Sequence, residues 1–378
     1  MKLLLIGPFP PPIHGMSLAN KMLKKGLKDN HIIRIVNTGS KKKLGNAEEM
    51  GLFKFEKLFA TIGPLFKGII LILFSKKIDL VYITPGQANW GYLKYIPFIW
   101  FAHFRGIPCV IHIHGGYFRH AYDQTSGWKR RLIDGSLKRL SGVVVLGESL
   151  RYMFEGLVPE EMIFTCPNGV EDEIFATEEE INQKIRRWQE DDTIRVLYLS
   201  NLLRSKGILD LLEAIKLLKQ DGVKVHLDVA GAIEPGIRKE VEKYFLELDK
   251  EVTYHGVVQG EKKKELLLRN YIFCLPTYYP NEGQPISILE AMANGCAIVT
   301  TNHGGIKDVI DERYSVFVRK NDPKEISKKL LKVAHKASFS REAWSCAKES
   351  FSSTRFFLRV KEIFVNVLDK ATQQGFKQ

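Results

Sequence analysis

One stretch of the chain decides its fold: Asn281-Glu282-Gly283-Gln284-Pro285-Ile286-Ser287-Ile288-Leu289-Glu290-Ala291-Met292-Ala293. It holds a glycine turn, a helix start and two glutamates eight positions apart. Proline is favoured in the first turn of a helix, because its missing N–H costs nothing there, so Pro285 predicts a helix start. The unpaired amides at such a start, here those of Gly283 and Gln284, suit a diphosphate and sugar hydroxyls. Glu290 lies roughly a turn and a half along the helix and can accept hydrogen bonds from the diol of a ribose.

The runs on either side of this stretch give the spacing of the two glutamates its meaning. Such a pair arises often by chance in a chain with 43 Asp and Glu, and a solvated helix face is the ordinary explanation. Here an apolar run from Tyr271 to Pro276 precedes the stretch, and another, Ala297–Thr301, follows it. The order predicts strand, loop, helix and strand, which is half of a doubly wound sheet.

Short apolar runs that end in turn residues recur along the whole chain. In the first half they predict strands at Lys2–Ile6, Leu80–Thr84, Val110–His114, Val143–Leu146 and Ile163–Cys166. In the second half they predict strands at Arg195–Ser200, Val225–Ala230, Val252–Val258, Tyr271–Thr277 and Ala297–Thr301. Strands that alternate with helices predict an α/β protein whose parallel sheets are covered on both faces.

The length of the chain and one charged segment predict two domains. At 378 residues the chain exceeds the size at which a single core usually stops growing. The segment near 175–192 is charged and poor in strand formers, which predicts a linker or hinge. Ligands of Rossmann-like domains bind beyond the carboxyl ends of the strands, so we expect the loops after the strands to face one interdomain cleft.

Cysteine usage and the lengths of the apolar runs exclude several classes of protein. The five cysteines stand singly with no Cys-x-x-Cys pair, which argues against a zinc site and a disulfide framework and favours a reducing cytoplasm. The apolar run after Met1 is too short for a signal peptide and predicts a first strand. The longest runs, Ile69–Phe74 and Tyr95–Ala102, fall far short of the ~20 residues that a membrane-spanning helix needs.

The net charge of +13 is concentrated in the first half. Residues 1–150 carry 22 Lys and Arg against 8 Asp and Glu, whereas residues 191–378 carry 30 against 25. Charge alone leaves nucleic acid, phosphorylated substrates and anionic lipid open as partners. Segments 53–59 and 64–70 mix aromatic, aliphatic and basic residues, as helices on a membrane surface do, although ordinary helices packed on a sheet are equally expected.

The loop after the predicted strand Arg195–Ser200 offers cations to a phosphate. Lys206 precedes Gly207 at the start of a helix whose apolar positions recur at the helical period, so its ammonium lies where phosphate would bind. Arg204 is a second candidate in the same loop, and a solvated arginine is equally expected there.

Two positions in the first half are candidates for contact with a ligand. His112 and His114 project from the same face of a predicted strand, but only His114 sits at its carboxyl end, so His112 is assigned to the core. Gly15 follows His14 and precedes an apolar helix, where bare backbone amides can approach a ligand.

Together these residues resemble the retaining glycosyltransferases of the two-domain B architecture, in particular family four of the group 1 glycosyltransferases, over nearly the whole chain. Glu282 and Glu290 match the family motif of two glutamates separated by seven residues. The resemblance implies that Glu282, Gly283 and Gln284 hold the donor sugar, that Glu290 binds the nucleotide ribose, and that Lys206 binds the donor diphosphate.

The resemblance extends to the rest of the chain, with one departure. His114 would lie beside the donor sugar, as a catalytic residue with Lys206 and Glu282, and Gly15 would belong to the glycine-rich first loop. The family usually has an arginine five residues before the lysine, where this chain has Asn201. Either Arg204 would supply the missing cation from a different position, or Lys206 would act alone with the helix amides. Asn201 can donate hydrogen bonds but brings no charge.

The resemblance implies a GT-B fold with two Rossmann-like domains. Residues 1–180 would form the acceptor-side domain, with a returning helix at about 355–378, and residues 190–354 the donor domain. The reaction would move a sugar, with retention and without a metal, from a UDP- or GDP-linked donor to an acceptor hydroxyl. The acceptor would be a saccharide or lipid-linked saccharide of cell-surface polysaccharide synthesis, and the enzyme would be cytoplasmic, with no nucleic-acid partner and no cofactor. With a lipid-linked acceptor, the basic first half would hold the enzyme as a peripheral protein on the anionic inner face of the plasma membrane.

Two other functions fit the same residues. A nucleotide-sugar 2-epimerase shares the architecture but transfers nothing to an acceptor. A non-catalytic polyanion-binding protein would explain the basic half but leave Glu290 and Lys206 without a role. A nicotinamide-dependent dehydrogenase is disfavoured, because no Gly-x-Gly-x-x-Gly follows the first strand.

Overall fold

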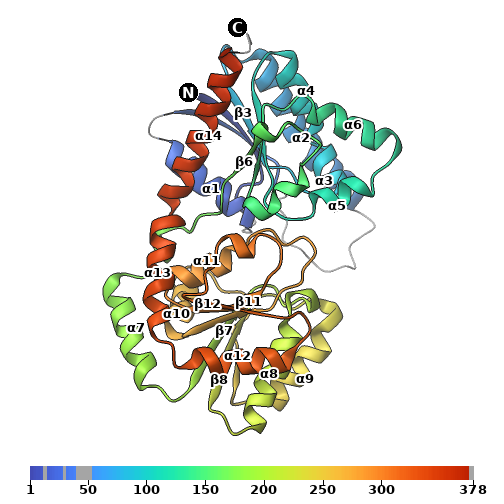
Figure 1. The fold of residues 1–378 in the computed structure, drawn as a ribbon. Helices are drawn as coiled ribbons and strands as arrows, with labels where there is room; N and C mark the ends of the chain where they lie inside the picture. Colours follow the sequence, from blue (N-terminus) through green and yellow to red (C-terminus); the bar gives the residue numbers. More distant parts are fainter. Residues whose placement is uncertain (12–14, 29–30, 40–52, 374–378) are drawn as a thin grey trace. The chain divides into compact units, whose positions relative to one another are not determined.

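The computed structural model describes residues 1–11, 15–28, 31–39 and 53–373, without the side chains of residues 53–62 and 89. The chain forms two compact units: unit 1 is Met1–Asn168 with Ser353–Gln378, and unit 2 is Gly169–Ser352. Each unit is built on one six-stranded sheet flanked by helices (Figure 1). The predicted α/β class with two doubly wound sheets is confirmed.

The sheet of unit 1 is parallel throughout. Its strands lie side by side in the order β2 (Ile32–Asn37), β1 (Lys2–Gly7), β3 (Leu80–Ile83), β4 (Cys109–His112), β5 (Gly142–Val145) and β6 (Ile163–Thr165). Alternate side chains of β1 enter different cores, because Leu4 and Ile6 belong to one apolar cluster and Leu3 and Leu5 to another. Both faces of the sheet are therefore buried, as parallel sheets require.

The helices of unit 1 divide between these two cores. The Leu4 core is covered by α2 (Phe53–Phe74), α3 (Asn89–Leu93), α4 (Ile96–Phe104), α5 (Phe118–Asp123) and α6 (Gly127–Leu137). The Leu3 core is covered by α1 (Gly15–Leu27) and by the last helix, α14 (Ser353–Gln373). Phe356, Val360 and Phe364 of α14 are buried in it, so the end of the chain packs with its beginning.

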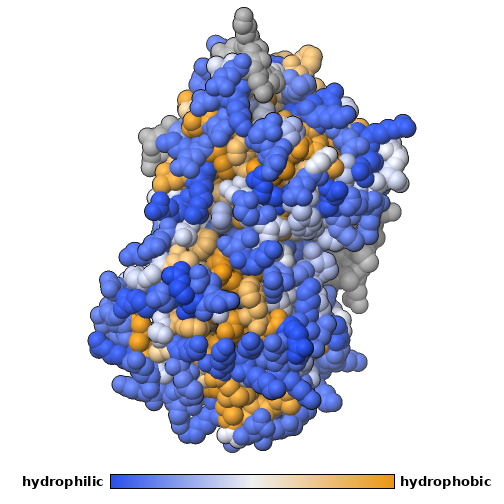
Figure 2. Space-filling model, in the orientation of Figure 1, coloured by the Kyte–Doolittle hydropathy of each residue, from blue (hydrophilic) through white to orange (hydrophobic). Residues whose placement is uncertain are grey.

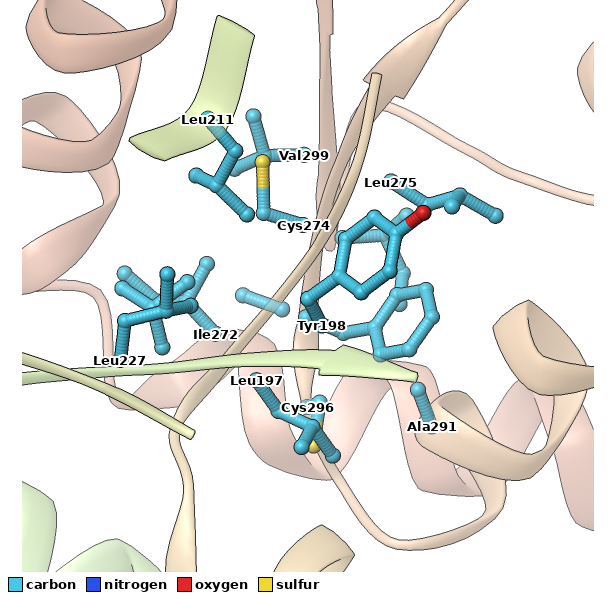
Figure 3. Close-up of a cluster of buried hydrophobic side chains, with 14 of the residues drawn as sticks. Leu197, Tyr198, Leu211, Leu227, Ile272, Cys274, Leu275, Ala291, Cys296 and Val299 are labelled. Atoms are coloured by element: carbon cyan, nitrogen blue, oxygen red, sulfur yellow. The ribbon is translucent and has the colours of Figure 1, made fainter. Parts of the chain in front are cut away.

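Unit 2 repeats the plan with a different strand order. Its parallel strands are β12 (Ser315–Val318), β11 (Ala297–Thr301), β10 (Ile272–Leu275), β7 (Ile194–Leu199), β8 (Val225–Ala230) and β9 (Val252–Tyr254). Its helices are α7 (Glu178–Glu190), α8 (Ile208–Gln220), α9 (Arg238–Glu247), α10 (Gly260–Arg269), α11 (Ile286–Ala293), α12 (Pro323–Ala334) and α13 (Ser338–Ser350). Figure 3 shows part of the core, where Leu211 of α8 meets Val299 of β11 near the central strands.

The predicted linker near 175–192 is wrong. Residues 178–190 form α7, and Thr177 and Glu180 close its first turn with a capping box. Ile181, Lys184 and Trp188 of this helix are buried in unit 2. The sequence contains the capping signal Thr-x-x-Glu and apolar residues spaced along one helix face. The many charged residues around them led to the prediction of a linker instead of a helix. The chain instead crosses between units at Asn168–Gly169 and at Ser352–Ser353.

Other boundaries move by a few residues. β4 ends at His112 and β9 at Tyr254, earlier than predicted, and the edge strands β2 and β12 were not predicted. Edge strands bury only part of their length, so their apolar pattern is weaker than that of central strands.

The start of α11 also differs from the prediction. Pro285 lies at the N-cap of α11, one position ahead of the helix, and not within its first turn.

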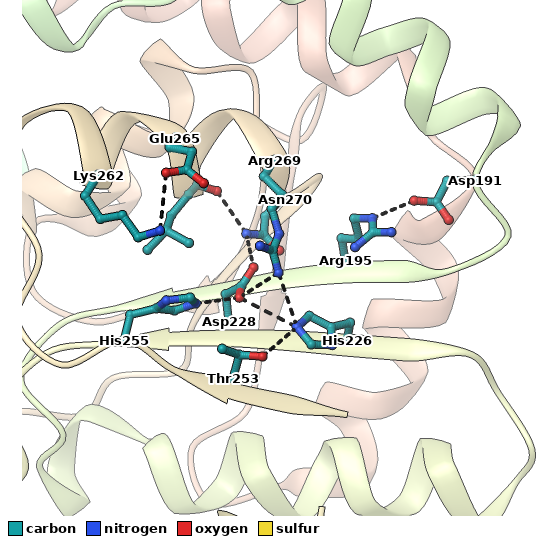
Figure 4. Close-up of polar contacts among 11 residues, drawn as sticks. Asp191, Arg195, His226, Asp228, Thr253, His255, Lys262, Glu265, Arg269 and Asn270 are labelled. Carbon is teal, nitrogen blue, oxygen red and sulfur yellow. Dashed lines mark hydrogen bonds and ion pairs between the residues drawn. The ribbon is translucent and has the colours of Figure 1, made fainter. Parts of the chain in front are cut away.

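A buried carboxylate braces the outer strands of unit 2 (Figure 4). Asp228 of β8 is fully buried and accepts hydrogen bonds from His255 Nε2 at 2.7 Å, Arg269 at 3.1 Å and Asn270 at 2.8 Å. A carboxylate only accepts, so Nε2 of His255 carries its proton. Burial alone would raise the pKa of Asp228, but these hydrogen bonds and the charge of Arg269 hold it well below its ordinary value.

The surface shows where apolar side chains remain uncovered. The visible face is mostly hydrophilic, with smaller hydrophobic patches between hydrophilic residues (Figure 2). Among the described residues, no helix combines the length and the apolar character that crossing a membrane requires.

We expect Asp228→Asn to lower the free energy of unfolding by about 3 kcal/mol at neutral pH, because it leaves Arg269 without its buried counter-charge. The folded pKa of Asp228 is depressed, so its contribution is present above the unfolded value near ~4 and is lost as pH falls through the folded value. Urea unfolding of both proteins from neutral to acid pH should therefore show the difference shrinking in acid. Asp192→Asn, which breaks an exposed pair with Lys224, is the control and should change little. An equal loss in both variants would contradict the bracing role.

Candidate functional site

The strand order of unit 2 changes direction between β7 and β10. From β7 the chain continues to β8 and β9 on one side, whereas from β10 it continues to β11 and β12 on the other. Ligands of open α/β sheets bind at this switch point, beyond the carboxyl ends of the strands. The loops that follow β7 and β10 hold Lys206 and Glu282, so the topology brings together residues 76 positions apart.

Backbone contacts fix these two loops against each other. The amide of Tyr278 donates to the carbonyl of Ser205 at 2.7 Å. Gly207 has φ +74°, and a Cβ there would lie 2.3 Å from the carbonyl oxygen of Pro276. Only glycine allows both the left-handed backbone and this close approach, so the Lys206-Gly207 pair is needed to place the lysine.

A short, mostly buried ion pair joins the two loops. Lys206 Nζ lies 2.5 Å from Glu282 Oε2, and these side chains are only 13% and 8% exposed. Thr277 Oγ1 donates to the same carboxylate oxygen at 3.0 Å, and the Lys206 ammonium lies 5.0 Å from the centre of the Tyr279 ring. Lysine and carboxylate are thus held in place before any ligand arrives.

The loop after β11 supports Glu282 from the other side. The amide of Gly305 donates to the carbonyl of Gly283 at 2.7 Å, and His303 Nε2 lies 2.8 Å from the carbonyl of Tyr279. Gly304 has φ +57°, and a Cβ there would lie 2.5 Å from the carbonyl oxygen of Glu282. The Gly304-Gly305 pair lets this loop press against the glycine turn of residues 282–283.

The second glutamate has its own cation. Glu290 on α11 is 6% exposed, and its Oε1 lies 2.5 Å from Nζ of Lys263 on α10. Burial raises the pKa of Glu290, and the Lys263 ammonium opposes that rise. Glu282 and Glu290 therefore bind different lysines and do not share a proton with each other as an acid–base pair would.

The structure does not bring Arg204 to the Lys206–Glu282 pair. Arg204 forms an exposed ion pair with Glu240 of α9. Asn201 is exposed, and its backbone carbonyl accepts a hydrogen bond from Tyr198 OH at 3.1 Å. Neither side chain supplements the charge of Lys206 in this arrangement, and the replacement of the missing arginine by Arg204 stays a prediction.

In unit 1 the predicted residues lie at the carboxyl end of its sheet. His114 follows β4, and its Nδ1 lies 3.0 Å from Oδ1 of Asn168, which implies that Nδ1 carries the proton. The ring of His112 is buried, stacks on His114 with centroids 4.1 Å apart, and has Tyr82 OH 2.7 Å from its Nδ1. Burial and the neighbouring His114 lower the pKa of His112. Gly15 is the first residue of α1, and His14 lies outside the described residues.

Four residues around the candidate site were not predicted: Thr277, Tyr279, Lys263 and His303. Thr277 ends a predicted strand, so the rule that ligands lie at carboxyl ends of strands could have found it. Lys263 stands in a run of three lysines on α10, and nothing in the sequence separates it from its neighbours. Within the part of the chain that the structure describes, no cluster of three or more His, Cys, Asp or Glu could hold a metal ion.

Residues 178–349 match the protein family described as Glycosyl transferases group 1. The putative colanic acid biosynthesis glycosyltransferase WcaL of Escherichia coli is 27% identical over 144 residues, which is 36% of this chain and 35% of WcaL. The human alpha-1,3/1,6-mannosyltransferase ALG2 is 28% identical over 216 residues, which is 54% of this chain and 47% of ALG2. The chain thus spans less than half the length of each of these relatives.

Solved structures with the same fold match almost the whole chain. HepE of Anabaena, in complex with UDP, superposes with a TM-score of 0.72 over 97% of this chain and all of that chain, at 16% identity. Sucrose-phosphate synthase of Thermosynechococcus elongatus gives a TM-score of 0.72 over 98% of this chain and 99% of that chain, at 15% identity. The fold is therefore GT-B, with two Rossmann-like units.

We expect Lys206→Met to lower the free energy of unfolding by about 3–5 kcal/mol, because it leaves the Glu282 carboxylate buried without its cation. The double variant Lys206→Met/Glu282→Gln should recover much of that loss in urea unfolding, since it removes the stranded charge. Arg204→Met, which breaks the exposed pair in the same loop, should leave the midpoint unchanged. If Lys206→Met and Arg204→Met lowered the free energy of unfolding equally, the buried ion pair would contribute no more to stability than the exposed one.

Proposed function

We propose that this protein is an enzyme that transfers a sugar from a nucleoside diphosphate sugar to a saccharide acceptor in polysaccharide synthesis. Its residues 178–349 match the group 1 glycosyltransferase family, and its fold is GT-B. The observation that carries the proposal is the Lys206–Glu282 ion pair at the switch point of unit 2. A cation fixed beside a carboxylate suits a ligand that has both a diphosphate and sugar hydroxyls.

The donor would bind across the residues of unit 2. The Lys206 ammonium would turn toward the diphosphate, and Glu282, released from part of that pairing, would accept hydrogen bonds from the sugar. Among the described residues, Glu282 Oε1 has no hydrogen-bond partner, which leaves it open to a hydroxyl. Glu290, paired with Lys263, would bind the ribose diol. HepE, which has the same fold, has been solved with UDP and with UDP-glucose, which supports a nucleotide donor of this kind.

The reaction breaks the bond between the anomeric carbon and the diphosphate oxygen and the O–H bond of the acceptor hydroxyl. It forms a bond between the anomeric carbon and the acceptor oxygen, and the proton goes to the leaving diphosphate. Negative charge grows on the leaving diphosphate, where Lys206 and the amides ahead of α11 would oppose it. Retention of configuration would follow from attack on the face that the diphosphate leaves. We assign no nucleophile and no metal to this step.

The acceptor would bind at the carboxyl end of the unit 1 sheet. His114, whose Nδ1 is held by Asn168, would present its ring near the donor sugar. We propose a lipid-linked saccharide as acceptor, because unit 1 carries the basic excess of the chain and WcaL is named for polysaccharide synthesis. Such an acceptor would bring the enzyme to the inner face of the plasma membrane.

We expect one of the UDP-, GDP- or ADP-sugars to raise the melting temperature of the protein in a thermal-shift panel that contains EDTA. Lys206→Met should lose most of the shift, and Glu290→Gln should weaken donor binding by roughly 10–100-fold, the range for a hydrogen bond to a charged group. If no nucleotide sugar stabilises the protein, the proposed function is wrong; if stabilisation needs a divalent metal, metal independence alone is wrong.

Incubation of the protein with the donor alone distinguishes a glycosyltransferase from a nucleotide-sugar 2-epimerase. A 2-epimer of the donor sugar appearing without an acceptor would replace transfer as the proposed reaction, whereas a product that requires an added saccharide supports it. Unchanged donor affinity in both Lys206→Met and Glu290→Gln would favour a polyanion-binding protein.

We expect Lys263→Met to make donor binding dependent on pH. Burial already raises the pKa of Glu290, and loss of this ammonium raises it further, so the carboxylate that binds ribose becomes protonated at a higher pH than in the parent. The donor KM of the variant should rise in acid and return toward that of the parent at higher pH, with kcat less affected. Lys264→Met is the matched control, because Lys264 pairs with Glu180 instead. A pH-independent KM in Lys263→Met would contradict the role of this lysine.

A further inference from the structure

Helix α2 leaves a row of large apolar side chains exposed. Phe66, Ile70 and Phe74 are 62%, 53% and 78% exposed, and their spacing of four residues places them on one side of the helix. The opposite side of α2, including the fully buried Ile72, packs into the core of unit 1. The exposed row is therefore not a product of poor packing, because the same helix has a second, buried face.

The row continues into a groove whose rim is basic. A cavity of about 520 Å³ is lined by Ile70 and Phe74 together with Ile32, which is itself 58% exposed. Its basic lining residues are Lys2, Arg34, Lys76 and Lys77. The groove thus combines an apolar floor with four cations.

A second groove adjoins the first and adds another cation. It has a volume of about 500 Å³, shares Lys76 and Lys77 with the first, and is also lined by Arg105. Arg105 NH1 donates to the carbonyl of Ile72 at 3.1 Å, which fixes the end of α4 beside the end of α2. Phe104, the preceding residue at the end of α4, is also 79% exposed.

Little negative charge opposes these cations. Among the described residues that line the two grooves, Asp79 is the one acidic residue. Its carboxylate accepts a hydrogen bond from the Lys2 amide at 2.7 Å and lies 4.0 Å from Lys77 Nζ, so it neutralises part of one lysine only. The net charge of the surface is strongly positive.

The grooves lie at the amino ends of the strands of unit 1. Lys2 begins β1, Ile32 begins β2, and Lys76 and Lys77 lie between the end of α2 and the start of β3. His114 and Gly15 follow the carboxyl ends of their strands, which is the opposite end of the same sheet. A partner bound at the amino-end edge would leave the loops of the candidate site uncovered.

We propose that this amino-end surface, defined by Phe66, Ile70, Phe74, Phe104, Lys76, Lys77 and Arg105, docks the protein on an anionic lipid bilayer. Exposed aromatic and aliphatic side chains on one side of a helix suit insertion into the interfacial layer of a membrane. The surrounding lysines and arginines suit anionic head groups, which attract basic residues within a Debye length. The proposal rests on unit 1 alone and holds whether or not the chain transfers sugar.

Flotation of the full chain with vesicles tests this proposal. Wild type should float with vesicles of phosphatidylcholine and phosphatidylglycerol and remain behind with phosphatidylcholine alone. Phe66→Ser/Phe74→Ser and Lys76→Gln/Lys77→Gln should each weaken binding to the anionic vesicles by at least about tenfold. Leu246→Ser/Val257→Ser and Lys328→Gln/Lys332→Gln, exposed positions of unit 2, are the matched controls and should bind as wild type does.

Three results would overturn the proposal. The first is equal recovery of wild type with neutral and anionic vesicles, and the second is an equal loss in the unit 2 controls. The third is concentration-dependent dimerisation in the absence of lipid that Phe66→Ser/Phe74→Ser abolishes, which would make the surface an interface between two copies. Neither donor nor acceptor is present in the assay, so a protein that floats but transfers no sugar would contradict the proposed function and not this one.

Discussion

The candidate site depends on the ion pair between Lys206 and Glu282. That pair can form because β7 and β10 are adjacent, paired strands whose following loops lie side by side. Their loops could not approach without Gly207, nor could the third loop support Glu282 without Gly304. Two close approaches that only glycine allows, at Gly207 and Gly304, therefore hold three loops together and fix the pair of charges. A charge pair that is already ordered costs little to align with a ligand, which is how preorganised sites stabilise developing charge.

The two glutamates of the opening stretch have separate environments. Glu282 lies in the loop ahead of α11 with Lys206 and Thr277, and Glu290 lies on the helix with Lys263. Each has one lysine, and each is nearly buried. Such an arrangement suits two hydrogen-bond acceptors for different parts of one ligand, because two carboxylates that exchanged a proton would need to lie together without intervening cations.

In unit 1 the carboxyl ends and the amino ends of the strands carry different groups of residues. Its carboxyl-end edge holds His114 against Asn168 and the stacked His112, while its amino-end edge carries exposed aromatic side chains among lysines and arginines. Both sheet faces are occupied by core packing, so polar and exposed groups collect at the edges. Part of the basic excess of the first half is thereby given a location, which a count along the sequence does not provide.

The sequence by itself determined the α/β class, most strands and the identity of Lys206, Glu282 and Glu290 as candidates, because strand periodicity, glycine turns and helix starts are local features. It misassigned α7 as a linker, since charge concealed an amphipathic helix whose buried face is evident only against unit 2. The tertiary structure alone decided that Lys263 pairs with Glu290, that Arg204 turns to Glu240, and that Phe66, Ile70 and Phe74 are exposed. These outcomes depend on which elements pack against each other, and contacts between residues distant along the chain leave no trace in local periodicity.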